Sequence, residues 1–129
     1  MKPRILIVDD DEGITQQLFW TLSDDYDVVT ANDMQSAVRR ATVYQPDVSI
    51  LDLHLPPETE SAEVGLRILE YLKTHLPESK VLVITSAAGM DTQKACTAGG
   101  ADEFLNKPFD TEQLLSTMRR MAPPTFDLV

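Results

Sequence analysis

The sequence is poor in residues that would cross-link it, span a membrane or attract polyanions. Its 129 residues include one cysteine, Cys96, which excludes an internal disulfide and suits a reducing compartment. Basic residues are outnumbered, because 11 Lys and Arg stand against 21 Asp and Glu, for a formal net charge of −10. Such a surface repels phosphate backbones, so we expect no direct binding of nucleic acid by this chain.

Long hydrophobic runs are also missing. No apolar stretch approaches the roughly 18 residues needed to span a bilayer. The first run, Ile5 to Val8, is too short for a signal peptide and is followed by acidic residues. We therefore expect no contact with a membrane and a cytoplasmic location. The length fits a single domain, which we place at residues 1–122, with residues 123–129 as a tail or linker stub.

Short β-branched runs alternate with segments of helical period along the chain. The runs that read as buried strands are ILIV at 5–8, VV at 28–29, VSIL at 48–51, VLVI at 81–84 and the weaker EFLN at 103–106. Between the first two, Ile14, Leu18 and Leu22 recur on one helical face. Strand–helix alternation with short links predicts an α/β fold: a single five-stranded parallel sheet with helices on both faces.

Capping and breaking residues set the expected helix ends. Asn32 and Asp33 are candidate caps for the second helix, and Pro77 ends the third. The fourth covers about Met90 to Ala98 and is closed by two glycines. The fifth opens at Asp110 and stops before residues 123–124.

Polar residues stand where the predicted strands end. Asp9 and Asp10 follow the first strand, Asp52 the third, Thr85 the fourth and Lys107 the fifth. The carboxyl ends of parallel strands share one edge of the sheet, where open α/β folds bind ligands. Carboxylates are ligands for Mg²⁺, and an aspartate can itself accept a phosphoryl group. A lysine and a hydroxyl can stabilise the transferring group, so the set predicts phosphoryl chemistry.

Four segments together resemble the receiver domains of two-component response regulators. They are ILIVDDDE at 5–12, PDVSILDLHLP at 46–56, VLVITSA at 81–87 and GADEFLNKPF at 100–109. The resemblance covers about Arg4 to Met121, nearly the whole chain. It implies the flavodoxin-like strand order 2-1-3-4-5, which the spacing of the segments does not determine.

The resemblance also assigns roles at the strand ends. Asp52 is implied as the phosphoacceptor, with Asp9 and Asp10 as the acidic pair that holds Mg²⁺ and Asp10 as the more direct ligand. The backbone carbonyl of His54 is implied as a third protein ligand, beside Asp52 itself. Asp11 falls outside the pattern, and we interpret it as a helix cap or a solvated charge.

Three further positions match the family's switching residues. Thr85 matches the hydroxyl residue that senses the phosphoryl group, and Phe104 the aromatic switch position. Lys107 matches the family's lysine, and its bond to Pro108 is expected to be cis, which is readily accessible only before proline.

The resemblance implies signalling rather than turnover of a substrate. A histidine kinase or a phosphotransfer protein would donate the phosphoryl group to Asp52, and the chain would catalyse only its own phosphorylation and dephosphorylation. The face built from the helix at 90–98, the strand at 103–106 and the last helix would then bind an output partner or domain, or a second copy of the chain as a homodimer. Transcription regulation is one output that the family serves.

One segment departs from the family pattern. Gly65, which we expect to be a loop glycine, comes thirteen positions after Asp52, and the connection PPETESAE at 56–63 is long and acidic. A longer loop of this kind resembles that of receivers attached to some AAA+ transcription activators.

Three other functions are compatible with parts of the pattern. In a haloacid-dehalogenase-like phosphatase or phosphotransferase Asp9 would be the nucleophile, but the later acidic pair of that class is missing after Lys107. A flavin carrier needs a phosphate loop where this chain has an acidic stretch. A receiver that only binds proteins would not need the five site residues that are present.

Overall fold

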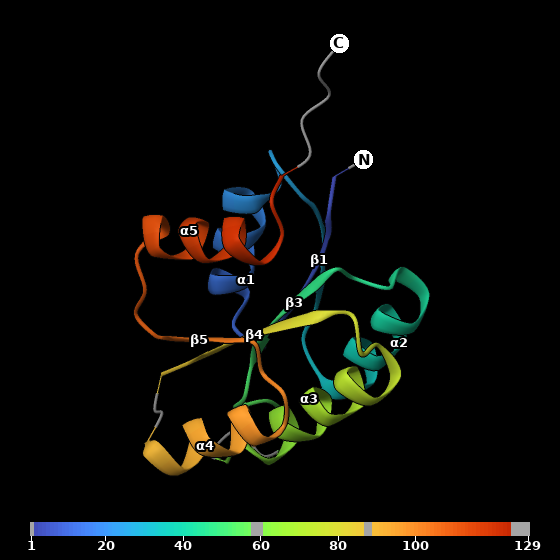
Figure 1. Cartoon of the computed structure of the whole chain (residues 1–129), viewed down its shortest axis with the longest axis vertical. Helices are drawn as coiled ribbons and strands as arrows, with labels where there is room; N and C mark the ends of the chain where they lie inside the picture. Colours follow the sequence, from blue (N-terminus) through green and yellow to red (C-terminus); the bar gives the residue numbers. More distant parts are fainter. Residues whose placement is uncertain (1, 58–60, 87–88, 125–129) are drawn as a thin grey trace.

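The computed structural model describes residues 2–57, 61–86 and 89–124, and in them a five-stranded sheet is covered by helices on both faces (Figure 1). The strands are β1 (Arg4–Val8), β2 (Asp27–Ala31), β3 (Val48–Asp52), β4 (Lys80–Thr85) and β5 (Glu103–Asn106). The helices are α1 (Glu12–Leu22), α2 (Met34–Tyr44), α3 (Glu63–His75), α4 (Met90–Ala98) and α5 (Thr111–Met121). All strand pairs are parallel in the order β2-β1-β3-β4-β5, which confirms the predicted fold.

The sheet separates two hydrophobic cores, because successive side chains of a strand point to opposite faces. In β1, Leu6 and Val8 belong to the core shared with α2, α3 and α4, whereas Ile5 and Ile7 pack with α1 and α5. Figure 1 shows the same division, with α1 and α5 on one side of the sheet and the other three helices opposite. Burial on both faces explains why the central strands are continuous apolar runs rather than alternating ones.

Short aspartate side chains begin three of the helices. The Asp11 carboxylate accepts hydrogen bonds from the backbone N–H groups of Gly13 and Ile14. Asp11 therefore caps α1, which was one of the two interpretations predicted from sequence. Asp33 caps α2 in a capping box, and Asp110 accepts from the N–H of Gln113 at the start of α5.

Helix α3 makes a very close approach to the backbone that follows β3. Gly65 lies in the first turn of α3 and not in a loop, which corrects the expectation from sequence. Its N–H donates to the carbonyl oxygen of Leu53 at 3.1 Å, and a Cβ atom added at this position would lie 2.3 Å from the Leu53 Cα atom. Only glycine fits here, so the first turn of α3 packs directly against the residue next to Asp52 despite the long connection. Residues 58–60 of that connection lie outside the described part.

The end of α5 is fastened to the core. The buried hydroxyl of Tyr26 donates to the carbonyl oxygen of Ala122 at 2.8 Å, and Ala122 has left the helical conformation (φ −146°, ψ 84°). The helix therefore stops before Pro123, as predicted, while most of the expected tail, residues 125–129, falls outside the described residues. Among the described residues no helix has the length and apolar character needed to cross a membrane.

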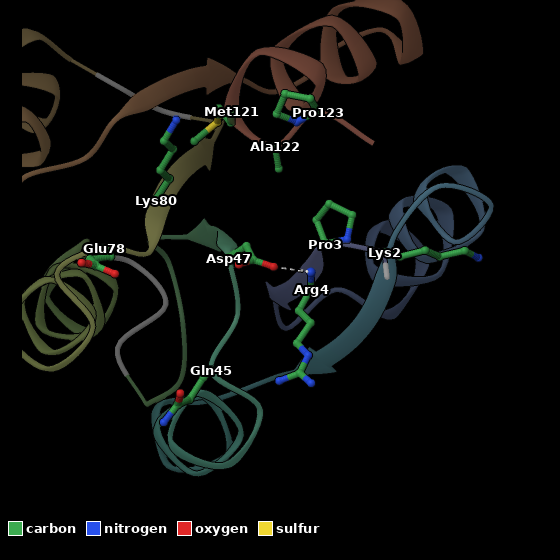
Figure 2. A pocket seen from close by; sticks show the side chains of 10 residues that line it. All are labelled: Lys2, Pro3, Arg4, Gln45, Asp47, Glu78, Lys80, Met121, Ala122 and Pro123. Atoms are coloured by element: carbon green, nitrogen blue, oxygen red, sulfur yellow. Dashed lines mark hydrogen bonds between the residues drawn. The ribbon is translucent and has the colours of Figure 1, made fainter. Parts of the chain in front are cut away.

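A hollow of about 630 Å³ lies at the edge of the sheet where the strands begin (Figure 2). Its lining mixes cations such as Lys80 with acids such as Glu78, and the Asp47 carboxylate there accepts from the N–H of Arg4 at 2.8 Å. This edge is opposite to the one where the predicted site residues stand, and its charges of both signs favour no particular ligand.

Candidate functional site

Three carboxylates meet at the carboxyl ends of β1 and β3. These two strands are neighbours, with Val8 beside Leu51, so Asp9 and Asp52 emerge at the same edge. One oxygen from each of Asp9, Asp10 and Asp52 lies within 4.8 Å of the others. Asp9 and Asp52 are buried and Asp10 is exposed, so the group opens to solvent on the Asp10 side.

A lysine from the far side of the sheet completes this group. Lys107 follows β5, and its backbone N–H donates to the carbonyl oxygen of Thr85 at the end of β4. Its ammonium donates to Asp9 Oδ2 at 2.9 Å and lies 3.5 Å from Asp52 Oδ2, with 14% of the side chain exposed. The Lys107–Pro108 peptide bond is cis. Residues nearly one hundred positions apart thus form one ion-pair cluster.

The charge of this cluster is unbalanced, because among the described residues three neighbouring carboxylates stand against one ammonium, which pairs with Asp9 and Asp52. Burial, and then the nearby Asp9 carboxylate, raise the pKa of Asp52, and the Lys107 charge only partly opposes them. Burial alone would disfavour the charged form of Lys107, but its hydrogen bond to Asp9 and the charge of Asp52 outweigh it and raise its pKa. The site therefore favours a further positive charge.

The other predicted residues surround the cluster. Thr85 is fully buried at the end of β4, and within the described part of the chain its Oγ1 atom has no hydrogen-bond partner. The N–H of His54 donates to Asp52 Oδ1 at 3.3 Å, which places the backbone of His54 beside the acceptor. Phe104 is half-buried in β5 and packs against the core shared with α3 and α4.

The cluster fits a hard divalent cation and a phosphoryl group. Oxygen ligands from a few carboxylates are what Mg²⁺ takes in phosphate chemistry, where it keeps several waters. The excess negative charge and the open side at Asp10 suit the ion, and the unsatisfied buried hydroxyl of Thr85 suits an anionic oxygen.

Comparison with known proteins gives a match over most of the chain. The family described as response regulator receiver domain matches residues 5–119. The chain belongs to this family. Receiver domains are signalling proteins of two-component systems that bind Mg²⁺ at an acidic pocket and interact with histidine kinases, and they are not conventional enzymes.

Relatives and solved structures agree with this family. Response regulator MprA of Mycobacterium ulcerans is 33% identical over 126 residues, which are 97% of this chain and 52% of that protein. Chemotaxis protein CheY4 of Vibrio cholerae is 29% identical with a TM-score of 0.84, over 94% of this chain and 99% of that one. NtrX of Brucella abortus is 30% identical with a TM-score of 0.83, over 94% of this chain and 27% of that one. The chain spans about half the length of the curated relatives that it matches.

Two features of this receiver domain were missed from sequence. The direct ion pair between Lys107 and Asp9 was not expected, because Lys107 was assigned to the phosphoryl group alone. The contact of Gly65 with Leu53 was hidden by the irregular spacing of the connection. Its one signal was a glycine near the start of an apolar helical face, where helix formers are normally preferred.

The raised pKa of Asp52 predicts a pH-dependent effect on stability. The folded protein holds this proton more tightly than the unfolded chain, so without metal the ionised carboxylate destabilises the fold. Stability is lost as the pH rises from about 4, the ordinary carboxyl range, through the raised pKa. In EDTA, Asp52→Asn should therefore raise the melting temperature by a few degrees at neutral pH and have little effect below about pH 4.

Calorimetry with and without Mg²⁺ checks this prediction. The wild-type protein should gain stability when Mg²⁺ is added, and Asp52→Asn should gain much less, because one carboxylate of the cluster is gone. Equal melting temperatures of the two proteins in EDTA at neutral pH would contradict the electrostatic reasoning.

Proposed function

We propose that this receiver domain accepts a phosphoryl group on Asp52 from the phosphohistidine of a histidine kinase or a phosphotransfer protein. The observation that supports the proposal is the convergence of Asp9, Asp10 and Asp52 within 4.8 Å, with Lys107 bonded into the same cluster. The alternative with Asp9 as nucleophile is not favoured by the family match, and the Asp9 carboxylate already accepts from both Lys107 and the N–H of Asp11.

The transfer step is a displacement at phosphorus. An oxygen of the Asp52 carboxylate attacks, a P–O bond forms, the P–N bond to the donor imidazole breaks, and the imidazole leaves and takes up a proton. Mg²⁺, when held by Asp9, Asp10, Asp52 and the His54 carbonyl, supplies charge neutralisation for the phosphoryl oxygens. Lys107 orients and stabilises the group from the other side.

The product changes the charge and the hydrogen bonding at the end of β4. An aspartyl phosphate adds anionic oxygens that the buried hydroxyl of Thr85 can bond. We expect Thr85 to move toward the group and the segment after β4 to follow, with Phe104 turning inward. The face formed by α4, β5 and α5 then changes its affinity for an output partner or domain, or for a second copy of the chain as a homodimer.

The domain boundary and the output belong to the same proposal. Residues 1–122 form the receiver domain, because α5 ends at Met121 and Ala122 is fastened by Tyr26, and residues 123–129 form a tail or linker stub. The MprA relatives extend well beyond the matched region, which supports control of a further domain or partner. A relative described as probable transcriptional regulatory protein TcrX of Mycobacterium tuberculosis, 29% identical, supports an output in transcription. The likeness of the long connection after β3 to receivers of AAA+ activators stays a prediction.

Mapping of the modified residue tests the proposal. The protein is incubated with Mg²⁺ and a phosphohistidine-bearing phosphotransfer domain, reduced with borohydride, which converts an acyl phosphate to homoserine, and analysed by peptide mass spectrometry. We expect homoserine at position 52. Modification at position 9 would support the phosphatase-like alternative, and an unmodified chain would overturn the proposal.

A further inference from the structure

Helix α4 buries little side-chain surface against the rest of the domain at its amino-terminal end. All nine of its residues are described, and Cys96, in its last turn, is the only buried one. Met90, the first residue, is 74% exposed, and the preceding Gly89 provides no side-chain cap. Among the described residues of the first turn no side chain is fully buried and only Thr92 is half-buried, so this turn depends mainly on its own backbone hydrogen bonds.

The other end of α4 is tightly fixed. Gly99 lies against Leu69 of α3, where an added Cβ atom would be 3.0 Å from the leucine Cδ2 atom. Gly100 has a φ of +96° and crosses the aliphatic stem of Lys73, with an added Cβ only 3.2 Å from the lysine Cγ. The N–H of Ala101 returns to the carbonyl oxygen of Cys96 at 3.0 Å. This turn can be built only with glycine at the crossing.

An ionic latch closes this turn onto the sheet. Lys73 Nζ, at the end of α3, donates to Asp102 Oδ2 at 2.6 Å and to the carbonyl oxygen of Ser79 at 2.9 Å. The same Asp102 oxygen accepts from the N–H of Val81 at 2.9 Å, and the Asp102 N–H donates to the Val81 carbonyl oxygen at 2.9 Å. We call this set the Lys73–Asp102 latch. It joins α3, the start of β4 and the α4–β5 turn through charge-assisted hydrogen bonds.

The latch is more than a surface ion pair. The side chains are 20% and 36% exposed, so solvent screens the pair only in part. Two backbone groups, the Ser79 carbonyl and the Val81 N–H, depend on the same two side chains. Loss of Lys73 or Asp102 would also leave one of these two backbone groups, at or just before the start of β4, without its partner, which costs more than loss of the ion pair alone.

The free end of α4 is the one that leads to the candidate site. Gly89 follows Thr85 and Ser86 by a short connection, and Thr85 is the residue expected to move when Asp52 is phosphorylated. A displacement of Thr85 would therefore shift the exposed first turn of α4 before it could affect the Lys73–Asp102 latch. The two ends of α4 thus differ in how firmly they are attached to the domain and in how near they lie along the chain to Thr85.

We propose that the Lys73–Asp102 latch makes the carboxyl-terminal end of α4 a fixed pivot, about which phosphorylation swings the amino-terminal end. The proposal rests on the proposed function and specifies which part of the output face moves. In this proposal the change in partner binding occurs at the exposed first turn of α4, around Met90 and Asp91. Residues Gly99 to Asp102 keep their positions.

Amide spectra of the wild-type protein test the direction of the swing. Beryllofluoride with Mg²⁺ mimics the phosphoryl group, and NMR chemical shifts and hydrogen exchange are compared with and without it. We expect large changes at residues 90–93 and small ones at 99–102. Changes of equal size at both ends, or larger ones at 99–102, would overturn the pivot.

The variant Lys73→Met tests the latch, because it keeps an aliphatic stem beneath Gly100 and removes the ammonium. Without any phosphoryl mimic, the amides of residues 99–102 should exchange about tenfold faster, the effect of losing one charge-assisted hydrogen bond. With beryllofluoride, the response should spread from 90–93 into 99–102. The matched control is Arg67→Met, which removes a cation of the same helix from an exposed ion pair with Glu63.

Three results would overturn the proposal. These are unchanged exchange at 99–102 in Lys73→Met, equal acceleration in Arg67→Met, or uniform acceleration that includes the β1 amides and so reports general instability. A wild-type protein that shows no response to beryllofluoride and accepts no phosphoryl label would instead overturn the proposed function and the swing. The exchange at 99–102 in Lys73→Met would then still decide whether the latch anchors the turn.

Discussion

Asparagine at position 52 is expected to lower phosphoryl incorporation by about a thousandfold or more, because an amide is a far weaker nucleophile than a carboxylate. Asp52 is 7% exposed and has Lys107 at 3.5 Å, so the amide keeps the size of the side chain and its place in the cluster. The measurement is label transferred from a phosphohistidine donor in Mg²⁺ over a time course.

The matched control for Asp52→Asn is Asp11→Asn. It removes one negative charge from the same acidic stretch, but Asn also caps helices well. The Asp11 side chain accepts from the N–H groups at the start of α1, and its bond to Asp9 is made by its backbone N–H, which the substitution keeps. Incorporation by this variant should stay close to that of the wild type. If Asp52→Asn takes label as well as Asp11→Asn does, Asp52 is not the acceptor.

Alanine at position 65 is expected to destabilise the fold by about 3 kcal/mol or more, the upper range for overpacking. The added methyl group would lie 2.3 Å from the Cα, 2.6 Å from the oxygen and 2.8 Å from the carbonyl carbon of Leu53. These are backbone atoms, so no change of rotamer relieves the clash, and either α3 or the backbone that follows β3 must shift. The free energy of unfolding in urea measures the effect.

Gly89→Ala is the matched control for Gly65→Ala. A Cβ at position 89 would meet nothing within 4 Å, and the expected change is below about 1 kcal/mol. A Gly65→Ala protein that is folded and as stable as Gly89→Ala would show that the approach of α3 to β3 is looser than described. A folded but weakened variant should also lose phosphoryl incorporation, since Leu53 directly follows Asp52.

Local signals were sufficient to predict the elements of this fold. The runs at 5–8 and 81–84 are buried on both faces, and such runs are readable from composition alone. The glycine pair after Ala98 and the aspartate at position 110 mark helix ends because their effect is confined to one turn of backbone. The order of the strands came from resemblance to a family, since spacing does not determine which parallel strands are neighbours.

The site was predictable to the extent that it depends on topology. Once the strands are parallel, residues at their carboxyl ends must share an edge, so Asp9 and Asp52 were expected to be close. The pairing of Lys107 with Asp9 was not predictable, because it depends on ångström-scale differences in the reach of one flexible side chain. The Lys73–Asp102 latch has no local signature either, since its partners are 29 residues apart and come together only in the folded chain.

The fastening of Ala122 by Tyr26 limits how motion could be transmitted past α5. Ala122 is not helical, its carbonyl oxygen is already bonded, and two prolines follow, so a continuous coiled-coil stalk cannot grow out of this helix. A rotation or an axial displacement of α5 would therefore not be transmitted past Ala122 through a continuous helix. A module attached beyond this point would be linked flexibly and held at a raised local concentration near the receiver domain. It would respond to the receiver domain by binding to its surface or by dissociating from it.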